Sequence, residues 1–172
     1  MLLFGAVLGV QAQKRSIYQG EVDLGVTYGP FGKTLGGVSL QTVQGARIGD
    51  HFSVGGGLGA ELVIGGCDEN HDVEPYMCCH DGIMGLVTPV FLNFKGYLDA
   101  SKRTTGYISF DLGLIPIFES HGRSSAMLYA CPAVGIKARK FKADLGYKFI
   151  GEYHGFQLRF GLFLGGGKQK EK

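Results

Sequence analysis

The chain has 172 residues, enough for one domain with a sizeable core, and it contains 30 glycines, 12 phenylalanines, 8 tyrosines and no tryptophan. Seventeen Lys and Arg residues against 15 Asp and Glu give a formal charge of +2, and no basic run carries interleaved aromatics, which argues against nucleic-acid binding. Glycine without a G-X-Y period excludes a collagen-like chain, and five prolines are too few for a disordered linker. The glycines are therefore predicted to lie in strands and turns.

The N-terminus reads "MLLFGAVLGVQAQKR", with residues 2–10 almost wholly apolar. The small-residue pattern Val10-Gln11-Ala12 resembles a cleavage site, so residues 1–13 are interpreted as the remnant of a secretory signal peptide without its basic start. A short apolar first strand is the alternative. No stretch approaches the ~20 apolar residues of a membrane-spanning helix, so any membrane crossing is expected to use strands.

Apolar and polar residues alternate with period 2 along most of the remaining chain. Seven segments show this pattern strongly: 17–29, 51–65, 86–98, 106–118, 127–138, 140–150 and 155–164. The segment 38–49 is weaker, because Leu40 and Ile48 share a parity with Thr42 and Gln44. A bulge near Thr42 would repair the register. With this segment included, the sequence predicts eight strands, each long enough to cross a bilayer at a tilt.

The strand charges all fall on the less apolar parity. They are Glu21, Asp23, Arg47, Glu61, Lys95, Asp111, Lys137, Lys142, Asp144, Lys148 and Arg159. A Lys or Arg facing lipid costs about 2–4 kcal/mol at the bilayer midplane, so lipid would demand this segregation. Glycines such as Gly57 and Gly161 share the charged parity, which favours that face for a crowded interior. The prediction is a lumen of paired charges and an apolar outer belt; the alternative is a soluble, lipocalin-like carrier with the apolar face turned inward.

The runs "GVSLQTVQGARIGDHFSVGGGLG", "PVFLNFKGYL", "YISFDLGL", "KADLGYKF" and "GFQLRFGLFL" together resemble the small outer-membrane β-barrel family of Gram-negative bacteria. The resemblance implies an all-β, eight-stranded, antiparallel, up-and-down transmembrane β-barrel over residues 14–164, integral to the outer membrane. It also implies insertion by the outer-membrane assembly machinery, which reads a final strand with alternating aromatics. In this chain the signal strand would present Phe156, Leu158, Phe160, Leu162 and Leu164, followed by a polar tail at 165–172.

The long connection at 66–85 contains a cluster of cysteines and histidines. An oxidising compartment favours disulfides, and the candidates are Cys67, Cys78, Cys79 and Cys131. We expect Cys67 to pair with Cys78 or Cys79, with the leftover near Cys131. Free thiols and a zinc site are the alternatives, although the adjacent pair Cys78-Cys79 does not easily supply two ligands to one tetrahedral ion.

No catalytic motif appears, so the expected role is non-enzymatic: structural, surface-interacting, or an accessory subunit of an envelope assembly, with a lumen too narrow for a general porin. No metal or cofactor is expected. The expected partners are outer-membrane lipid, the assembly machinery and a protein that contacts the 66–85 loop. The alternative is a barrel enzyme modifying lipids or peptides with loop residues, for which the candidates are His71, His80, His121, His154, Ser120, Ser124, Asp68, Asp81 and Glu152.

Overall fold

The computed structural model describes residues 16–29, 35–65, 83–118, 124–151 and 153–164. These residues form nine antiparallel strands and their short turns: β1 (Ser16–Tyr28), β2 (Leu35–Ile48), β3 (Phe52–Gly65), β4 (Ile83–Val87), β5 (Val90–Tyr97), β6 (Thr104–Phe118), β7 (Ser124–Ala138), β8 (Phe141–Ile150) and β9 (Tyr153–Leu164). Among the described residues, no helix is long and apolar enough to span a membrane.

β4 and β5 are two halves of one crossing. Both pair with β3 in a single continuous register, in which Glu61 lies opposite Val87 and Leu58 opposite Val90. The ladder is interrupted at Pro89, which has no N–H to donate, although its carbonyl accepts a hydrogen bond from the Gly59 amide at 2.9 Å. The barrel therefore has eight crossings, as predicted, and the crossing expected at 86–98 starts earlier, at Ile83.

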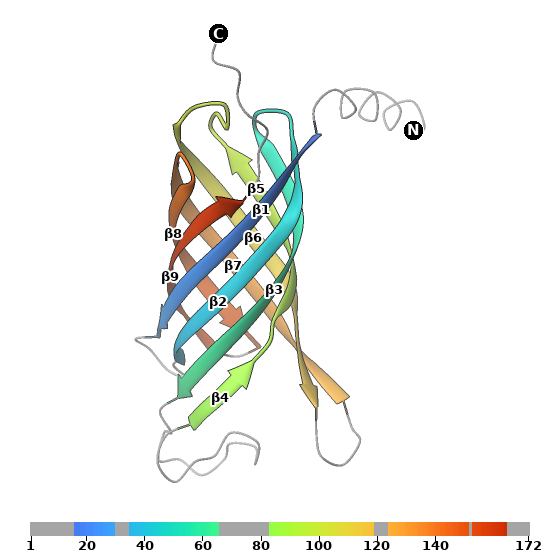
Figure 1. Ribbon diagram of the computed structural model, residues 1–172. Coiled ribbons are helices and arrows are strands. Elements are labelled where there is room, and N and C mark those ends of the chain that lie inside the picture. The colour runs from blue at the N-terminus through green and yellow to red at the C-terminus, as the bar shows by residue number, and fades with distance from the viewer. Residues whose placement is uncertain (1–15, 30–34, 66–82, 119–123, 152, 165–172) are drawn as a thin grey trace.

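The sheet closes on itself (Figure 1). β1 pairs with both β2 and β9, β2 pairs also with β3, and the remaining crossings follow in chain order. Closure brings the first and last strands side by side. Among the described strands, β4 pairs with β3 alone, so the wall is unpaired between β4 and the end of β6 beyond Leu114. The predicted all-β, eight-stranded, up-and-down barrel is confirmed.

Side chains alternate between the lumen and the outside along every crossing, and the apolar set faces outward. On β9, for example, Phe156, Leu158 and Phe160 are exposed whereas Gln157 and Arg159 are buried. The same division holds on β1, where Leu24 and Val26 face outward. This orientation is opposite to that of a soluble ligand carrier, whose apolar side chains line the interior.

The predicted bulge near Thr42 is wrong. β2 pairs residue for residue with both neighbours through Thr42, so Thr42 and Gln44 point outward with Leu40. Their polar groups are satisfied locally: Tyr18 Oη donates to Gln44 Oε1, Gln44 Nε2 donates to Thr42 Oγ1 at 2.9 Å, and Thr42 Oγ1 donates to the Glu21 carbonyl at 3.1 Å. Because this chain of hydrogen bonds satisfies the polar atoms on the outer surface, the strand keeps its register.

Glycine makes room inside the wall at two crowded points. A Cβ on Gly57 would lie 2.3 Å from the ring of Phe91, and a Cβ on Gly161 would lie 1.8 Å from Asp23 Oδ1. The interior of an eight-stranded barrel is only wide enough for side chains to fill it. The glycine-rich parity therefore faces the lumen because the large lumen side chains need the space.

The two ends of the barrel differ. The connections 49–51, 98–103 and 139–140 lie together at one end, here named the short-turn end, where β1 also begins and β9 ends (Figure 1). The backbones of two of these turns are joined, because the Arg139 amide donates to the Arg103 carbonyl at 2.6 Å. The β7–β8 turn is also held to β9 by the Phe163 amide, which donates to the Lys140 carbonyl at 2.7 Å.

Candidate functional site

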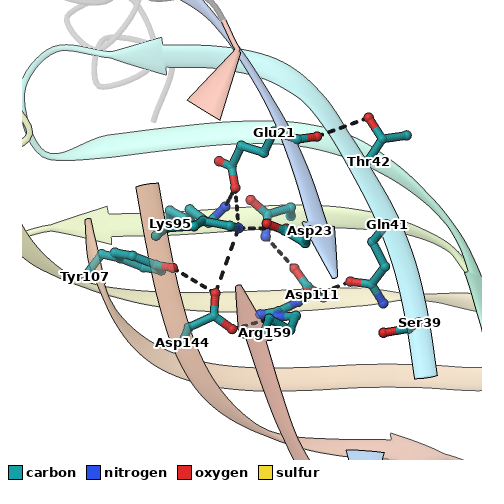
Figure 2. Close-up of polar contacts among 12 residues, drawn as sticks. Glu21, Asp23, Ser39, Gln41, Thr42, Lys95, Tyr107, Asp111, Asp144 and Arg159 are labelled. Atoms are coloured by element: carbon teal, nitrogen blue, oxygen red, sulfur yellow. Dashed lines mark hydrogen bonds and ion pairs between the residues drawn. The ribbon is translucent and has the colours of Figure 1, made fainter. Parts of the chain in front are cut away.

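A network of buried charges crosses the middle of the lumen (Figure 2). This central network consists of Glu21, Asp23, Lys95, Asp111, Lys142, Asp144 and Arg159, all predicted lumen residues. They come from β1, β5, β6, β8 and β9, so the contacts link crossings that are not neighbours in the wall.

Lys142 binds three carboxylates in the half of the central network nearer the short-turn end. Its Nζ lies 2.5 Å from Glu21 Oε2, 2.7 Å from Asp23 Oδ2 and 3.8 Å from Asp144 Oδ2. Lys95 donates to the same Glu21 oxygen from the β5 wall. Two ammonium groups thus share Glu21, and removal of either leaves a buried carboxylate short of a partner.

Arg159 organises the other half of the central network. Its Nε donates to Asp144 Oδ1 at 2.6 Å and its Nη1 to Asp111 Oδ2 at 2.5 Å. The remaining oxygens also accept hydrogen bonds, since Tyr107 Oη donates to Asp144 at 2.7 Å and Asn93 Nδ2 donates to Asp111. A planar guanidinium suits this fork between two carboxylates better than an ammonium does.

A second buried ion pair lies farther toward the opposite end. Lys148 Nζ contacts both carboxylate oxygens of Glu61, at 2.5 and 2.7 Å, and donates to Thr27 Oγ1 at 2.8 Å. Gln157 Nε2 donates to Ser39 Oγ at 3.1 Å between this pair and the central network. Nine of the eleven predicted lumen charges thus lie buried inside the barrel and paired.

Apolar side chains fill the part of the lumen beside the charges. The cluster contains Val43, Val63, Phe91, Ile115, Tyr129, Cys131 and Ile150. Tyr129 is fully buried and packs against Phe91 with ring centroids 5.4 Å apart. The alternation of polar and apolar residues does not identify this cluster, because its members share the charged parity; their size and apolarity are the only signal.

The other two predicted charges, Arg47 and Lys137, lie at the short-turn end and are only half-buried. Lys137 Nζ contacts the Ala100 carbonyl at 3.5 Å and lies 5.2 Å from the Phe163 ring centroid. It also lines a hollow of about 490 Å³ formed with Lys102, Arg103, Arg139 and Lys140. Every described residue that lines this hollow is basic.

The sequence analysis did not identify this basic hollow, which combines two turns and a strand end. The available signal was two basic pairs, at 102–103 and 139–140, in connections that a barrel brings to one end. Asp99 lies in the same β5–β6 turn, where a hydrogen bond from the Ser101 hydroxyl lowers the pKa of its carboxyl. Asp99 therefore stays ionised near Lys102, 3.6 Å away at an exposed position.

The reactive residues of the sequence analysis are mostly outside the described residues. Cys67, Cys78 and Cys79 fall there, as do all the enzyme candidates except His154 and the backbone of Ser124. Cys131 is described: it is a free thiol, fully buried in the lumen, 3.5 Å from Gln157 Oε1. His154 Nδ1 lies 2.7 Å from the Tyr147 hydroxyl, and the His154 ring stacks on the Tyr147 ring. Among the described residues, no three His, Cys, Asp or Glu side chains gather as a metal site requires.

No protein-family model and no curated protein matches the chain. Among solved structures it is similar to Neisserial surface protein A (NspA), with a TM-score of 0.53 and 12% identity over 88% of this chain and 97% of that chain. It is also similar to the N-terminal β-barrel domain of Pseudomonas aeruginosa OprF (TM-score 0.46, 17% identity, 87% and 97% covered). A third is the Yersinia pestis outer membrane protein Ail (TM-score 0.48, 14% identity, 85% and 99% covered).

At this identity the likeness to NspA establishes the fold alone. That fold is the closed, eight-stranded antiparallel β-barrel expected from the sequence. The predicted resemblance is therefore confirmed at the level of architecture.

Proposed function

We infer that this chain is an integral protein of the bacterial outer membrane, with the short-turn end in the periplasm. The observation that carries this inference is the continuous apolar outer surface, to which every crossing contributes exposed side chains such as Leu24, Leu62, Leu112 and Leu145. Water does not readily accept an apolar belt of this extent, whereas a bilayer needs one. A closed barrel also satisfies the backbone hydrogen bonds inside lipid, where an open sheet edge is not tolerated.

The packed lumen supports a role other than solute diffusion. Buried ion pairs and the Phe91–Tyr129 cluster occupy the interior, and an aqueous channel needs about twice as many strands. The role that fits is non-enzymatic: a structural or surface-interacting barrel, or an accessory subunit of an envelope assembly. A protein partner would meet the loops at the end opposite the short turns, the 66–85 connection among them.

The final strand supports assembly by the outer-membrane insertion machinery. Phe156, Leu158, Phe160, Leu162 and Leu164 form one outward row on β9. The row begins with an aromatic and repeats at every second residue, which is the pattern that the resemblance implies for the insertion signal.

The test is to express the chain behind a complete signal peptide, isolate the outer-membrane fraction, and compare its gel mobility with and without boiling. A band that requires detergent and shifts on boiling is expected, because a closed barrel resists unfolding by the detergent until it is heated. Purified protein in planar bilayers is expected to give no steady conductance. A protein recovered soluble from the periplasm would refute the membrane location, and a stable open channel would refute the packed lumen alone.

A further inference from the structure

The basic hollow at the short-turn end is more ordered than a chance group of surface charges. Its two turns are tied together by the hydrogen bond between the Arg139 amide and the Arg103 carbonyl, 2.6 Å long. The second turn is also anchored to β9 through the Lys140 carbonyl. Backbone contacts therefore hold the cationic side chains of Lys102, Arg103, Arg139 and Lys140 around one space.

Arg139 occupies a backbone conformation that arginine rarely adopts. Its φ is +57°, and among the described residues it is the one non-glycine residue with a positive φ. Glycine or asparagine takes this conformation at a lower cost, and strained residues persist where the surrounding structure holds them for a purpose. The Arg139 side chain, which lines the hollow, is therefore carried by a backbone conformation that favours smaller residues.

Lys137 extends the positive charge toward the lumen mouth. Its ammonium group contacts a backbone carbonyl and the rings of Tyr97 and Phe163, which lie 5.9 and 5.2 Å from it. Asp99 does not line the hollow; its half-buried carboxylate lies 3.6 Å from the exposed ammonium group of Lys102. The hollow thus keeps an excess of positive charge that an anion would neutralise.

An apolar surface lies directly beside the hollow on the outer wall. Leu98, Ile136 and Phe141 are 80%, 59% and 66% exposed, and they lie at the ends of β5, β7 and β8 next to the basic turns. Gly106 has no side chain to separate these residues, and the Leu98 side chain packs against the position that a Gly106 Cβ would occupy. A ligand that fits both surfaces has an anionic head and hydrocarbon chains.

We propose that the hollow is a binding site for the phosphate headgroup of an anionic phospholipid in the periplasmic leaflet, with the acyl chains lying on the surface formed by Leu98, Ile136 and Phe141. This proposal rests on the membrane location inferred above. Basic residues at a membrane surface attract anionic lipids, and each charge contributes separately. A soluble anion would use the hollow without the apolar surface, whereas a phospholipid uses both.

The experiment uses the complete barrel folded in zwitterionic micelles, with amide NMR signals of Arg103, Arg139 and Lys140 as the readout. The probes are dioctanoyl phosphatidylglycerol, dioctanoyl phosphatidylcholine, inorganic phosphate and a soluble muropeptide. Saturable shifts with phosphatidylglycerol, weakened by salt and much smaller with the other three, are the expected result. Equal shifts with phosphatidylcholine, equal affinity for inorganic phosphate, or preference for the muropeptide would each overturn the lipid site.

Two variants sharpen the test. Arg139→Asn with Lys140→Gln removes two charges, and asparagine tolerates the positive φ, so the fold is retained and phosphatidylglycerol affinity is expected to fall about thirtyfold. Asp50→Asn, at the same end but of opposite charge, is the matched control and should bind as well as or better than the parent. Unchanged affinity in the double variant would refute the site.

The failure of this proposal is distinguishable from failure of the membrane location. A chain that does not insert into vesicles of either lipid refutes the membrane location, and the lipid site with it. A chain that inserts and shifts on boiling, but does not distinguish phosphatidylglycerol from phosphatidylcholine, refutes the lipid site alone.

Discussion

Arg159 on β9 reaches Asp111 on β6 across the lumen, with Nη1 2.5 Å from Oδ2, although β7 and β8 separate the two strands in the wall. The same guanidinium contacts Asp144 at 2.6 Å. The two carboxylates are fully buried, so Arg159 is the group that neutralises both of them at this level of the barrel.

Arg159→Met is expected to lower the free energy of unfolding by about 3–5 kcal/mol, because it leaves Asp111 buried without a cation and Asp144 with only Lys142, 3.8 Å away. The measurement is guanidinium unfolding in phosphatidylcholine vesicles. Lys102→Gln is the control, since it breaks the exposed Lys102–Asp99 pair, which is worth about 0–1 kcal/mol. Adding Asp111→Asn and Asp144→Asn to Arg159→Met should restore part of the lost free energy of unfolding. If Arg159→Met alone is no less stable than the Lys102→Gln control, the pairing is contradicted.

The sequence predicts which side of the barrel wall the charged residues face, but not which residues they contact. Period-2 alternation places Glu21, Lys95 and Arg159 on the lumen side, because a charge on the lipid-facing side is costly. Which charge meets which depends on the tilt and stagger of the strands, and no local pattern encodes these. The contact of Lys95 with Glu21, 74 residues earlier, is therefore found only in the three-dimensional structure.

The two errors at the level of strands have local physical causes. Thr42 and Gln44 suggested a bulge because polar groups facing lipid are costly, yet Tyr18 and the Glu21 carbonyl satisfy them in place. The single strand predicted at 86–98 is instead two strands, β4 and β5, because Pro89 removes a donor from the ladder. The basic hollow was missed because it combines turns that become neighbours only when the barrel closes.

Leu158 lies on the outer face midway along β9, between Val26 and Leu145 of the flanking strands. Leu158→Arg is expected to cost about 2–4 kcal/mol in vesicles, because it places a charge near the bilayer midplane. Ala138→Arg, outward at the short-turn end, is the matched control and is expected to cost about 0–1 kcal/mol near the interface. Equal costs in the vesicle unfolding assay would show that the outer face does not lie in hydrocarbon.

Gly161 and Gly56 give a matched pair on opposite faces of the wall. Gly161→Ala places a methyl group 1.8 Å from Asp23 Oδ1 and 2.6 Å from the Val22 carbonyl, so we expect a loss of about 1–3 kcal/mol from overpacking. Gly56→Ala meets no atom within 4 Å and is expected to change stability by about 0.5 kcal/mol or less. Unfolding midpoints of the two variants in the same vesicles test this; similar values would mean that the lumen near Asp23 is not tightly packed.

Cys131 is a free thiol that the barrel wall seals from reagents in water. In a variant with Cys67, Cys78 and Cys79 changed to Ser, we expect no maleimide labelling of the folded protein and one label per chain after unfolding without reductant. Peptide mapping of the unreduced parent chain then reports all four cysteines, with Cys131 labelled on unfolding and Cys67 protected by the predicted disulfide to Cys78 or Cys79. Labelling of Cys131 in the folded variant would refute its burial. An unlabelled Cys131 in the unfolded, unreduced parent would instead mean that it is joined to one of the loop cysteines, because only a disulfide protects a thiol once the barrel has opened.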